Sequence, residues 1–153
     1  MPESADQSAT HPAGNPFGNS ITSEEIVDTL GFFDTWEDRY RYIIDLGKEL
    51  PAMPEAQHTD DRLVRGCQSK VWIDVAHADG RLQFAVDSDA FIVKGLLGVV
   101  LAAYNNRTPQ EIIDFDVEGY FESLALLNHL SPTRGNGLRA MVKQIRDAAT
   151  EAL

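Results

Sequence analysis

The feature that most constrains the fold is a pair of alternating segments joined by the dipeptide Asp79-Gly80. Apolar residues occupy every second position on both sides: Val71, Ile73 and Val75 before the dipeptide, and Leu82, Phe84 and Val86 after it. A period of two is typical of a strand with one buried face, and Asp-Gly is typical of a tight turn. The pattern therefore predicts a β-hairpin. Because two strands rarely make a stable sheet, we also expect a short third strand at Leu63-Val64.

Two helices are predicted ahead of the hairpin. Thr22 and Glu25 have the spacing of a capping box, so a short helix is expected to start there. Asp34 is expected to cap a longer helix, whose apolar stripe runs through residues 36–50. Residues 51–61 contain two prolines and show no periodicity, which predicts an irregular connection that leads toward the hairpin.

Helices also dominate the chain after the hairpin. Residues 90–104 are apolar on nearly all sides, which predicts a buried helix with residues 87–89 as its capping cluster. Gly95 and Gly98 inside this helix are expected to allow a close approach to a neighbouring element. Capping signals predict further helices after three residues: Thr108, Asp116 and Ser131. This order indicates an α+β domain in which a small antiparallel sheet of about three strands packs against several helices.

Composition separates a tail from this domain. Residues 1–21 are rich in Pro, Gly, Ser and Asn and have neither a basic start nor an apolar run, so we expect a disordered tail, no secretory signal, and one domain over residues 22–153. The formal net charge of −11 argues against nucleic acid and an anionic membrane as partners. No apolar stretch reaches the length of a membrane span, and we expect a cytoplasmic protein.

The single cysteine, Cys67, lies between the irregular connection and the hairpin. A lone cysteine is more often a small buried hydrophobe, but its neighbours Gly66 and Gln68-Ser69 do not suit a core. The cations Arg65 and Lys70 favour the thiolate, whereas burial would oppose it. We therefore interpret Cys67 as a presented thiol. One cysteine cannot form an internal disulfide or a self-contained zinc or iron–sulfur site, so no metal and no cofactor are expected.

Five stretches of the chain together resemble the SufE/CsdE family: YIIDLG at 42–47, GCQSKVW at 66–72, DSD at 87–89, IVKGL at 92–96 and HLSPTR at 129–134. The resemblance covers the chain from about Trp36 to its end. It implies a SufE/NifU-like fold and a sulfur acceptor and activator for a pyridoxal-phosphate-dependent cysteine desulfurase of the SufS or CsdA type. Cys67 would then carry the sulfur as a persulfide and pass it to an iron–sulfur scaffold complex.

The resemblance also implies that residues around Cys67 shape the cysteine loop or contact the partner: Arg65, Gly66, Gln68, Ser69, Asp89 and Arg134. Asp89 fits equally well as a carboxylate at a helix start, and Arg134 as a solvated residue near one. His129 is interpreted as structural more than proton-transferring. Lys70 stands where the family motif often has Gln, which adds a charge near the thiol.

Other kinds of protein remain open. A redox-reactive single-thiol protein fits the cationic setting of Cys67, although no resolving cysteine is present. A cysteine hydrolase would pair Cys67 with His58, but nothing in the sequence orients that imidazole. SufE-like and CsdE-like roles share the motifs, so a carrier for another sulfur-transfer pathway is a further alternative. In either role the chain is expected to act with a desulfurase and not as a stand-alone enzyme.

Overall fold

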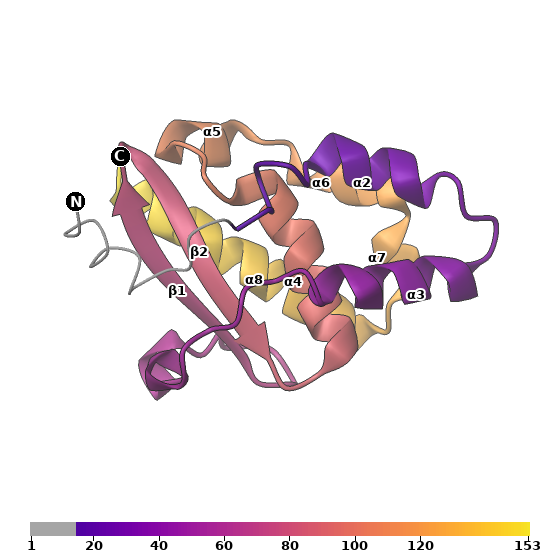
Figure 1. The fold of residues 1–153 in the computed structure, drawn as a ribbon, viewed down its shortest axis with the longest axis horizontal. Coiled ribbons are helices and arrows are strands. Elements are labelled where there is room, and N and C mark those ends of the chain that lie inside the picture. Colours follow the sequence, from indigo (N-terminus) through magenta and orange to yellow (C-terminus); the bar gives the residue numbers. More distant parts are fainter. Residues whose placement is uncertain (1–14) are drawn as a thin grey trace.

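A computed structural model describes residues 15–153 (Figure 1). The elements are, in chain order, α2 (Ser23–Leu30), α3 (Trp36–Gly47), the 3₁₀ turns η1 (Glu55–Gln57) and η2 (Asp60–Arg62), β1 (Val71–Ala78), β2 (Arg81–Ser88), α4 (Phe91–Tyr104), α5 (Pro109–Asp114), α6 (Val117–Leu124), α7 (Leu126–His129) and α8 (Pro132–Glu151). The hairpin lies on the left of Figure 1, α2, α3, α6 and α7 lie on the right, and α4 passes between them. The predicted α+β class is confirmed.

The predicted hairpin is also confirmed. Strands β1 and β2 pair in antiparallel register from Val71↔Ser88 to Ala78↔Arg81. Asp79 and Gly80 both have positive φ, at 54° and 76°, as a two-residue turn of type I′ requires. This turn matches the right-handed twist of the strands that it joins.

The predicted third strand is wrong, because the sheet has two strands in the part of the chain that the structure describes. Leu63 forms only an isolated bridge with Trp72, and the amide of Val64 donates to the carbonyl of Val71 at 2.8 Å. Gly66 then adopts a φ of 94°, which turns the chain away from the edge of β1. The pairing therefore ends after one bridge, and the buried face of the hairpin is covered by helix instead of by more sheet.

Helix α4 is the centre of the core. Eleven of its fourteen residues are buried, as its apolar sequence predicts. Its glycines give the expected close approach: a Cβ on Gly95 would lie 2.7 Å from the carbonyl carbon of Ile43 in α3, and one on Gly98 would lie 3.0 Å from the ring of Phe17. Although α4 is strongly apolar, no helix within residues 15–153 combines the length and apolar character needed to cross a membrane.

Most predicted helix caps are present, and two are displaced. Helix α5 has the full capping box between Thr108 and Glu111, and the side chains that cap α2, α6 and α8 are those of Thr22, Asp116 and Ser131. Helix α3 is capped by Thr35 and not by Asp34, one residue earlier. Ala90 occupies the cap position of α4 without a side-chain bond, so residues 87–89 do not cap that helix.

The described residues include the end of the predicted tail. Residues 1–14 lie outside them, but Phe17 is fully buried against α4. The side chain of Asn105 fixes this segment, since it donates to the carbonyl of Phe17 at 3.0 Å and accepts from the amide of Phe84 at 2.8 Å. The chain therefore joins the core several residues before residue 22, where the domain was predicted to begin.

Candidate functional site

Cys67 lies on the loop between η2 and β1, at a small pocket of about 100 Å³. The polar lining comes from Gln68, Ser69, Ser131, Thr133 and Arg134, and the apolar lining from Val71, Val93, Leu96 and Met141. The loop supplies the sulfur, while α4 and the first turns of α8 supply most of the walls. The thiol is partly buried, which places it between the two interpretations of a presented thiol and a core residue.

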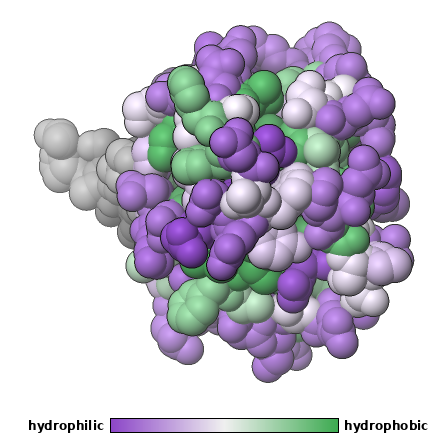
Figure 2. Space-filling model, turned by 90° about the vertical axis from the view of Figure 1, so that its right-hand side faces the viewer, coloured by the Kyte–Doolittle hydropathy of each residue, from purple (hydrophilic) through white to green (hydrophobic). Residues whose placement is uncertain are grey.

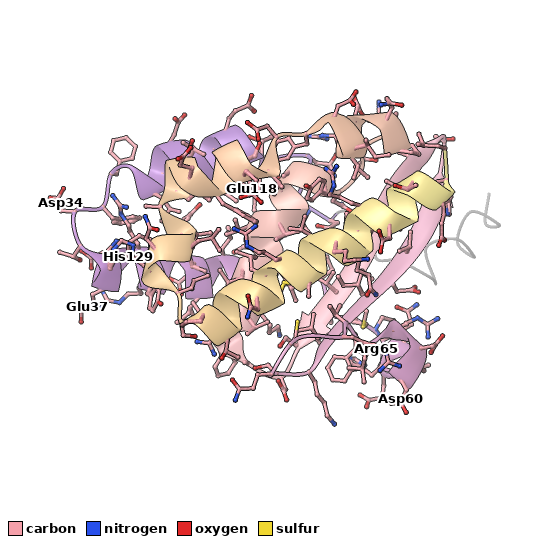
Figure 3. All side chains as sticks on the ribbon, turned by 180° about the vertical axis from the view of Figure 1, so that it is seen from behind. Asp34, Glu37, Asp60, Arg65, Glu118 and His129 are labelled. Carbon is pink, nitrogen blue, oxygen red and sulfur yellow. The ribbon has the colours of Figure 1, made fainter. Side chains whose placement is uncertain are left out.

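The surroundings of the sulfur favour the protonated thiol. Its Sγ lies 3.6 Å from the carbonyl oxygen of Gly137, to which only a protonated sulfur can donate. Burial raises the pKa of the Cys67 thiol, which is the opposite of the effect expected from the neighbouring cations. Figure 3 shows Arg65 beside Asp60 at the η2 end of the loop, and Arg65 does not line the pocket.

Two residues fix the path of the loop on either side of the sulfur. Gly66 needs its φ of 94°, which side-chain-bearing residues rarely adopt, to bring the chain round to Cys67. The carboxylate of Asp89 accepts from the amide of Lys70 at 3.1 Å, and the amide of Asp89 donates to the carbonyl of Lys70 at 3.3 Å. Asp89 is therefore bonded to the cysteine loop instead of to the start of α4.

The start of α8 forms the wall opposite the loop. Arg134 lies in its first turn and lines the pocket, and its amide donates to the hydroxyl of the capping Ser131 at 3.2 Å. Gly137 follows on the same helix, where a Cβ would lie 3.5 Å from the sulfur of Cys67. A methyl group at this position would therefore be in ordinary contact with the thiol.

The long connection before Cys67 is fixed to the hairpin by two ion pairs that the sequence did not reveal. Nε2 of His58 lies 2.7 Å from a carboxylate oxygen of Asp87 on β2, and the two side chains are 16% and 24% exposed. Arg62 donates to Asp74 on β1 at 2.7 Å. The ring of His58 also meets Trp72 edge-on at 4.6 Å between centroids. Pairing across more than ten residues leaves no periodic signal by which sequence reasoning could have found it.

His58, which the hydrolase hypothesis would pair with Cys67, has a different partner. His58 is oriented, contrary to expectation, but toward Asp87, and it does not line the Cys67 pocket. The ring of His129 stacks on that of Trp36, with 3.8 Å between the ring centroids. Figure 3 shows His129 at the opposite end of the molecule from Arg65. Its carbonyl accepts from the hydroxyl of Tyr40 at 2.9 Å, which supports a structural role. Within residues 15–153 no three His, Cys, Asp or Glu side chains are grouped to hold a metal ion.

The His58–Asp87 pair predicts a measurable titration. The hydrogen bond to Asp87 raises the pKa of His58 above its ordinary 6.5, so the pair stabilises the fold fully below that pH. This contribution is lost as the pH rises through the raised pKa. NMR titration of the imidazole protons should give a midpoint above 6.5 for native His58 and a lower one in Asp87→Asn. Asp89→Asn is the matched control, and it should leave the titration midpoint of His58 unchanged. A native midpoint at or below 6.5 would contradict the prediction.

Comparison with known proteins identifies the family of this chain. The family model described as "SufE: Fe-S metabolism associated domain" matches residues 24–149, which is most of the chain. The chain belongs to the SufE family. An uncharacterized SufE-like protein of Rhizobium meliloti is 45% identical over 131 residues, covering 82% of this chain and 93% of the relative. One of Rhizobium etli is likewise 45% identical, covering 82% and 88%.

A solved structure supports the fold of this SufE-family chain. The solution structure of a hypothetical protein from Thermus thermophilus superposes with a TM-score of 0.70, covering 85% of this chain and 94% of the other. The two sequences share only 16% identity, so this similarity concerns the fold alone. The resemblance that the five sequence stretches suggested is confirmed at the level of family and fold.

Proposed function

We propose that this SufE-family chain accepts sulfane sulfur on Cys67 from a pyridoxal-phosphate-dependent cysteine desulfurase, stimulates that enzyme, and passes the sulfur to the scaffold of iron–sulfur cluster assembly. The observation that carries the proposal is the position of its single thiol, partly exposed on a loop and facing a small pocket. Among residues 15–153, no imidazole lines that pocket to make the thiol a hydrolytic nucleophile. These features of the described residues support a carrier role more than a hydrolytic one.

The transfer is a thiol exchange. The thiolate of Cys67 attacks the terminal sulfur of a persulfide on the desulfurase cysteine, a new sulfur–sulfur bond forms on Cys67, and the bond within the partner's persulfide breaks. The partner's thiolate leaves with the electron pair. The proton that Cys67 holds against the carbonyl of Gly137 must leave first, because the thiolate is the attacking species. A second exchange delivers the sulfur to the downstream acceptor.

The alternative of a redox-sensing thiol receives less support from the site. Sensor cysteines have a low pKa and open access, and they are often poised next to a resolving cysteine. Burial raises the pKa of Cys67, and the chain contains no second cysteine. The choice between a SufE-like and a CsdE-like role depends on the desulfurase partner, and it is addressed by testing desulfurases of both the SufS and the CsdA type.

The test is the intact mass of the chain after incubation with a cysteine desulfurase and free cysteine. Native protein should gain about one sulfur mass, reductant should reverse the gain, and Cys67→Ser should gain nothing. Desulfurase turnover, measured as alanine released, should rise with native protein and not with Cys67→Ser. Run with desulfurases of both types, the experiment also assigns the partner. No sulfur on the native chain with an otherwise active desulfurase of each type would refute the proposal.

A further inference from the structure

The start of α4 exposes an aromatic side chain close to the cysteine loop. Phe91 is 76% exposed, although it belongs to the most apolar and most buried helix of the fold. The preceding Asp89 is bonded to Lys70 of the cysteine loop through both its amide and its carboxylate. The following Val93 lines the Cys67 pocket. In the sequence, Phe91 therefore lies between two residues that touch the cysteine site.

Any protein that delivers sulfur to Cys67 must cover this region. The sulfur is partly buried, so a donor sulfur can bond to it only when the partner's surface meets the rim of the pocket. A specific interface buries about 800 Å² on each partner, which is a disc of about 16 Å radius. Phe91 is the first residue of α4, two residues before Val93 of the pocket wall, so its backbone lies near the pocket while its exposed ring points to a different side of the helix from Val93. We expect a partner that covers a disc of that size around Cys67 to reach this ring. Docking would remove its ring from water.

The charges around the same rim are cationic, in contrast with the rest of the chain. The formal net charge is −11, yet Lys70 is exposed on the cysteine loop and Arg134 lines the pocket. The carboxylate at this rim, that of Asp89, accepts the amide of Lys70. A surface of this kind is complementary to an apolar recess bordered by carboxylates.

We propose that Phe91 is the apolar anchor of the desulfurase-docking surface and that Lys70 is its electrostatic guide. The occupant is the cysteine desulfurase of the proposed function, on which this inference rests, and its surface beside the persulfide cysteine is expected to offer an apolar recess with an acidic border. An aromatic residue buried at the centre of an interface contributes more to binding than the contacts around it. Lys70 acts on the association rate and on its dependence on salt.

The experiment measures the rate of sulfur acceptance against carrier concentration, with the desulfurase that charges the native chain. Phe91→Ser should raise the KM for the carrier about tenfold or more and leave the rate at saturation close to native, because the ring touches no reacting atom. Lys70→Glu should raise the KM at low salt, and the difference from native should shrink as salt is added. Melting temperatures should remain near native, since both side chains are exposed.

Matched controls are available on this chain. Phe32 is 82% exposed in the turn between α2 and α3, which Figure 1 draws at the right, away from the cysteine loop at the lower edge. Figure 2 faces that right-hand end, where apolar side chains also interrupt a mostly hydrophilic surface, so exposure alone does not single out Phe91. Phe32→Ser should leave the KM unchanged. Arg41→Glu in the first half of α3, whose side chain is 66% exposed, is the matching charge control.

The outcomes separate this inference from the proposed function. If the native chain gains no sulfur from any desulfurase, the proposed function fails and the inference fails with it. If the native chain is charged but Phe91→Ser has a native KM, or Phe32→Ser is equally impaired, only the inference is refuted. A native dimer that Phe91→Ser dissociates without a change in KM would instead assign Phe91 to self-association.

Discussion

Replacing Gly95 with alanine is expected to destabilise the fold by about 3 kcal/mol, with a fall in melting temperature of about 10 °C. Helices α3 and α4 touch here backbone to backbone. A Cβ on Gly95 would overlap the carbonyl group of Ile43. The carbonyl carbon and the Cγ2 atom of Ile43 would each lie 2.7 Å from that Cβ. A carbonyl group within a helix cannot rotate away as a flexible side chain can. The two helices must therefore separate, and both belong to the core.

Gly135→Ala is the matched control for that experiment. Gly135 is also helical, but a Cβ there would meet the side chain of Leu127 at 3.6 Å, an ordinary contact distance. This variant should be as stable as native or more stable by up to about 1 kcal/mol, because alanine favours the helix more than glycine does. Urea or thermal unfolding, followed by circular dichroism, measures the stability of both variants against the native protein. A Gly95→Ala protein of native stability would show that α3 and α4 can adjust at no cost.

The same contact illustrates which parts of the fold a sequence predicts well. The hairpin, its Asp79-Gly80 turn and the buried helix over residues 90–104 depend on local patterns, and the structure confirms them. The sequence also predicts that another element packs close to α4 at Gly95, since a glycine inside an apolar helix usually serves to allow such a contact. The sequence pattern does not predict that this element is α3, because the contact joins residues about fifty positions apart in the chain.

The errors have identifiable physical causes. Residues 87–89 have the composition of a helix cap, but their carboxylates bond to other groups: His58 and Lys94 bind Asp87, and the amide of Lys70 binds Asp89. The third strand at Leu63-Val64 is limited to one bridge by the turn at Gly66. The first error therefore comes from contacts between separate elements, and the second from a local turn of the backbone.

The candidate site was only partly predictable, because it too depends on contacts between separate elements. Cys67 and its immediate neighbours form one continuous stretch with a strong local signal. The walls of the pocket come from α4 and α8, so Val93, Gly137 and Met141 could not be assigned to it from spacing. Only the family resemblance made Arg134 a candidate site residue, and Arg134 does line the pocket. Arg65, which came from the same resemblance, lies outside the lining.

Alkylation of Cys67 is expected to begin at a higher pH in the folded protein than in the unfolded chain. Burial raises the pKa of this thiol, and its hydrogen bond to the carbonyl of Gly137 exists only with the proton in place. The thiolate is the reactive form, and below the pKa its fraction changes about tenfold per pH unit. At neutral pH the folded protein should therefore react with iodoacetamide several-fold more slowly than the chain in urea.

The sign of the linked stability follows from the same shift. A thiol with a raised pKa binds its proton more tightly in the folded state, so its contribution to stability is complete below the unfolded pKa. The contribution is lost as the pH rises through the folded pKa. Alkylation rates from about pH 6.5 to about pH 10 give both midpoints directly. Arg134→Gln adds a control: if that guanidinium steadies the thiolate, the folded midpoint should rise further in the variant.

Equal midpoints in the folded and unfolded chains would mean that the pocket does not change the pKa of the Cys67 thiol. A folded midpoint below the unfolded one would mean that the cations near the loop outweigh burial, which would favour the redox-reactive alternative. A raised midpoint has a consequence for sulfur transfer, because few molecules of the free protein then carry the thiolate at neutral pH. Under saturating desulfurase, acceptance at neutral pH that is faster than this thiolate fraction permits would show that docking itself changes the surroundings of Cys67.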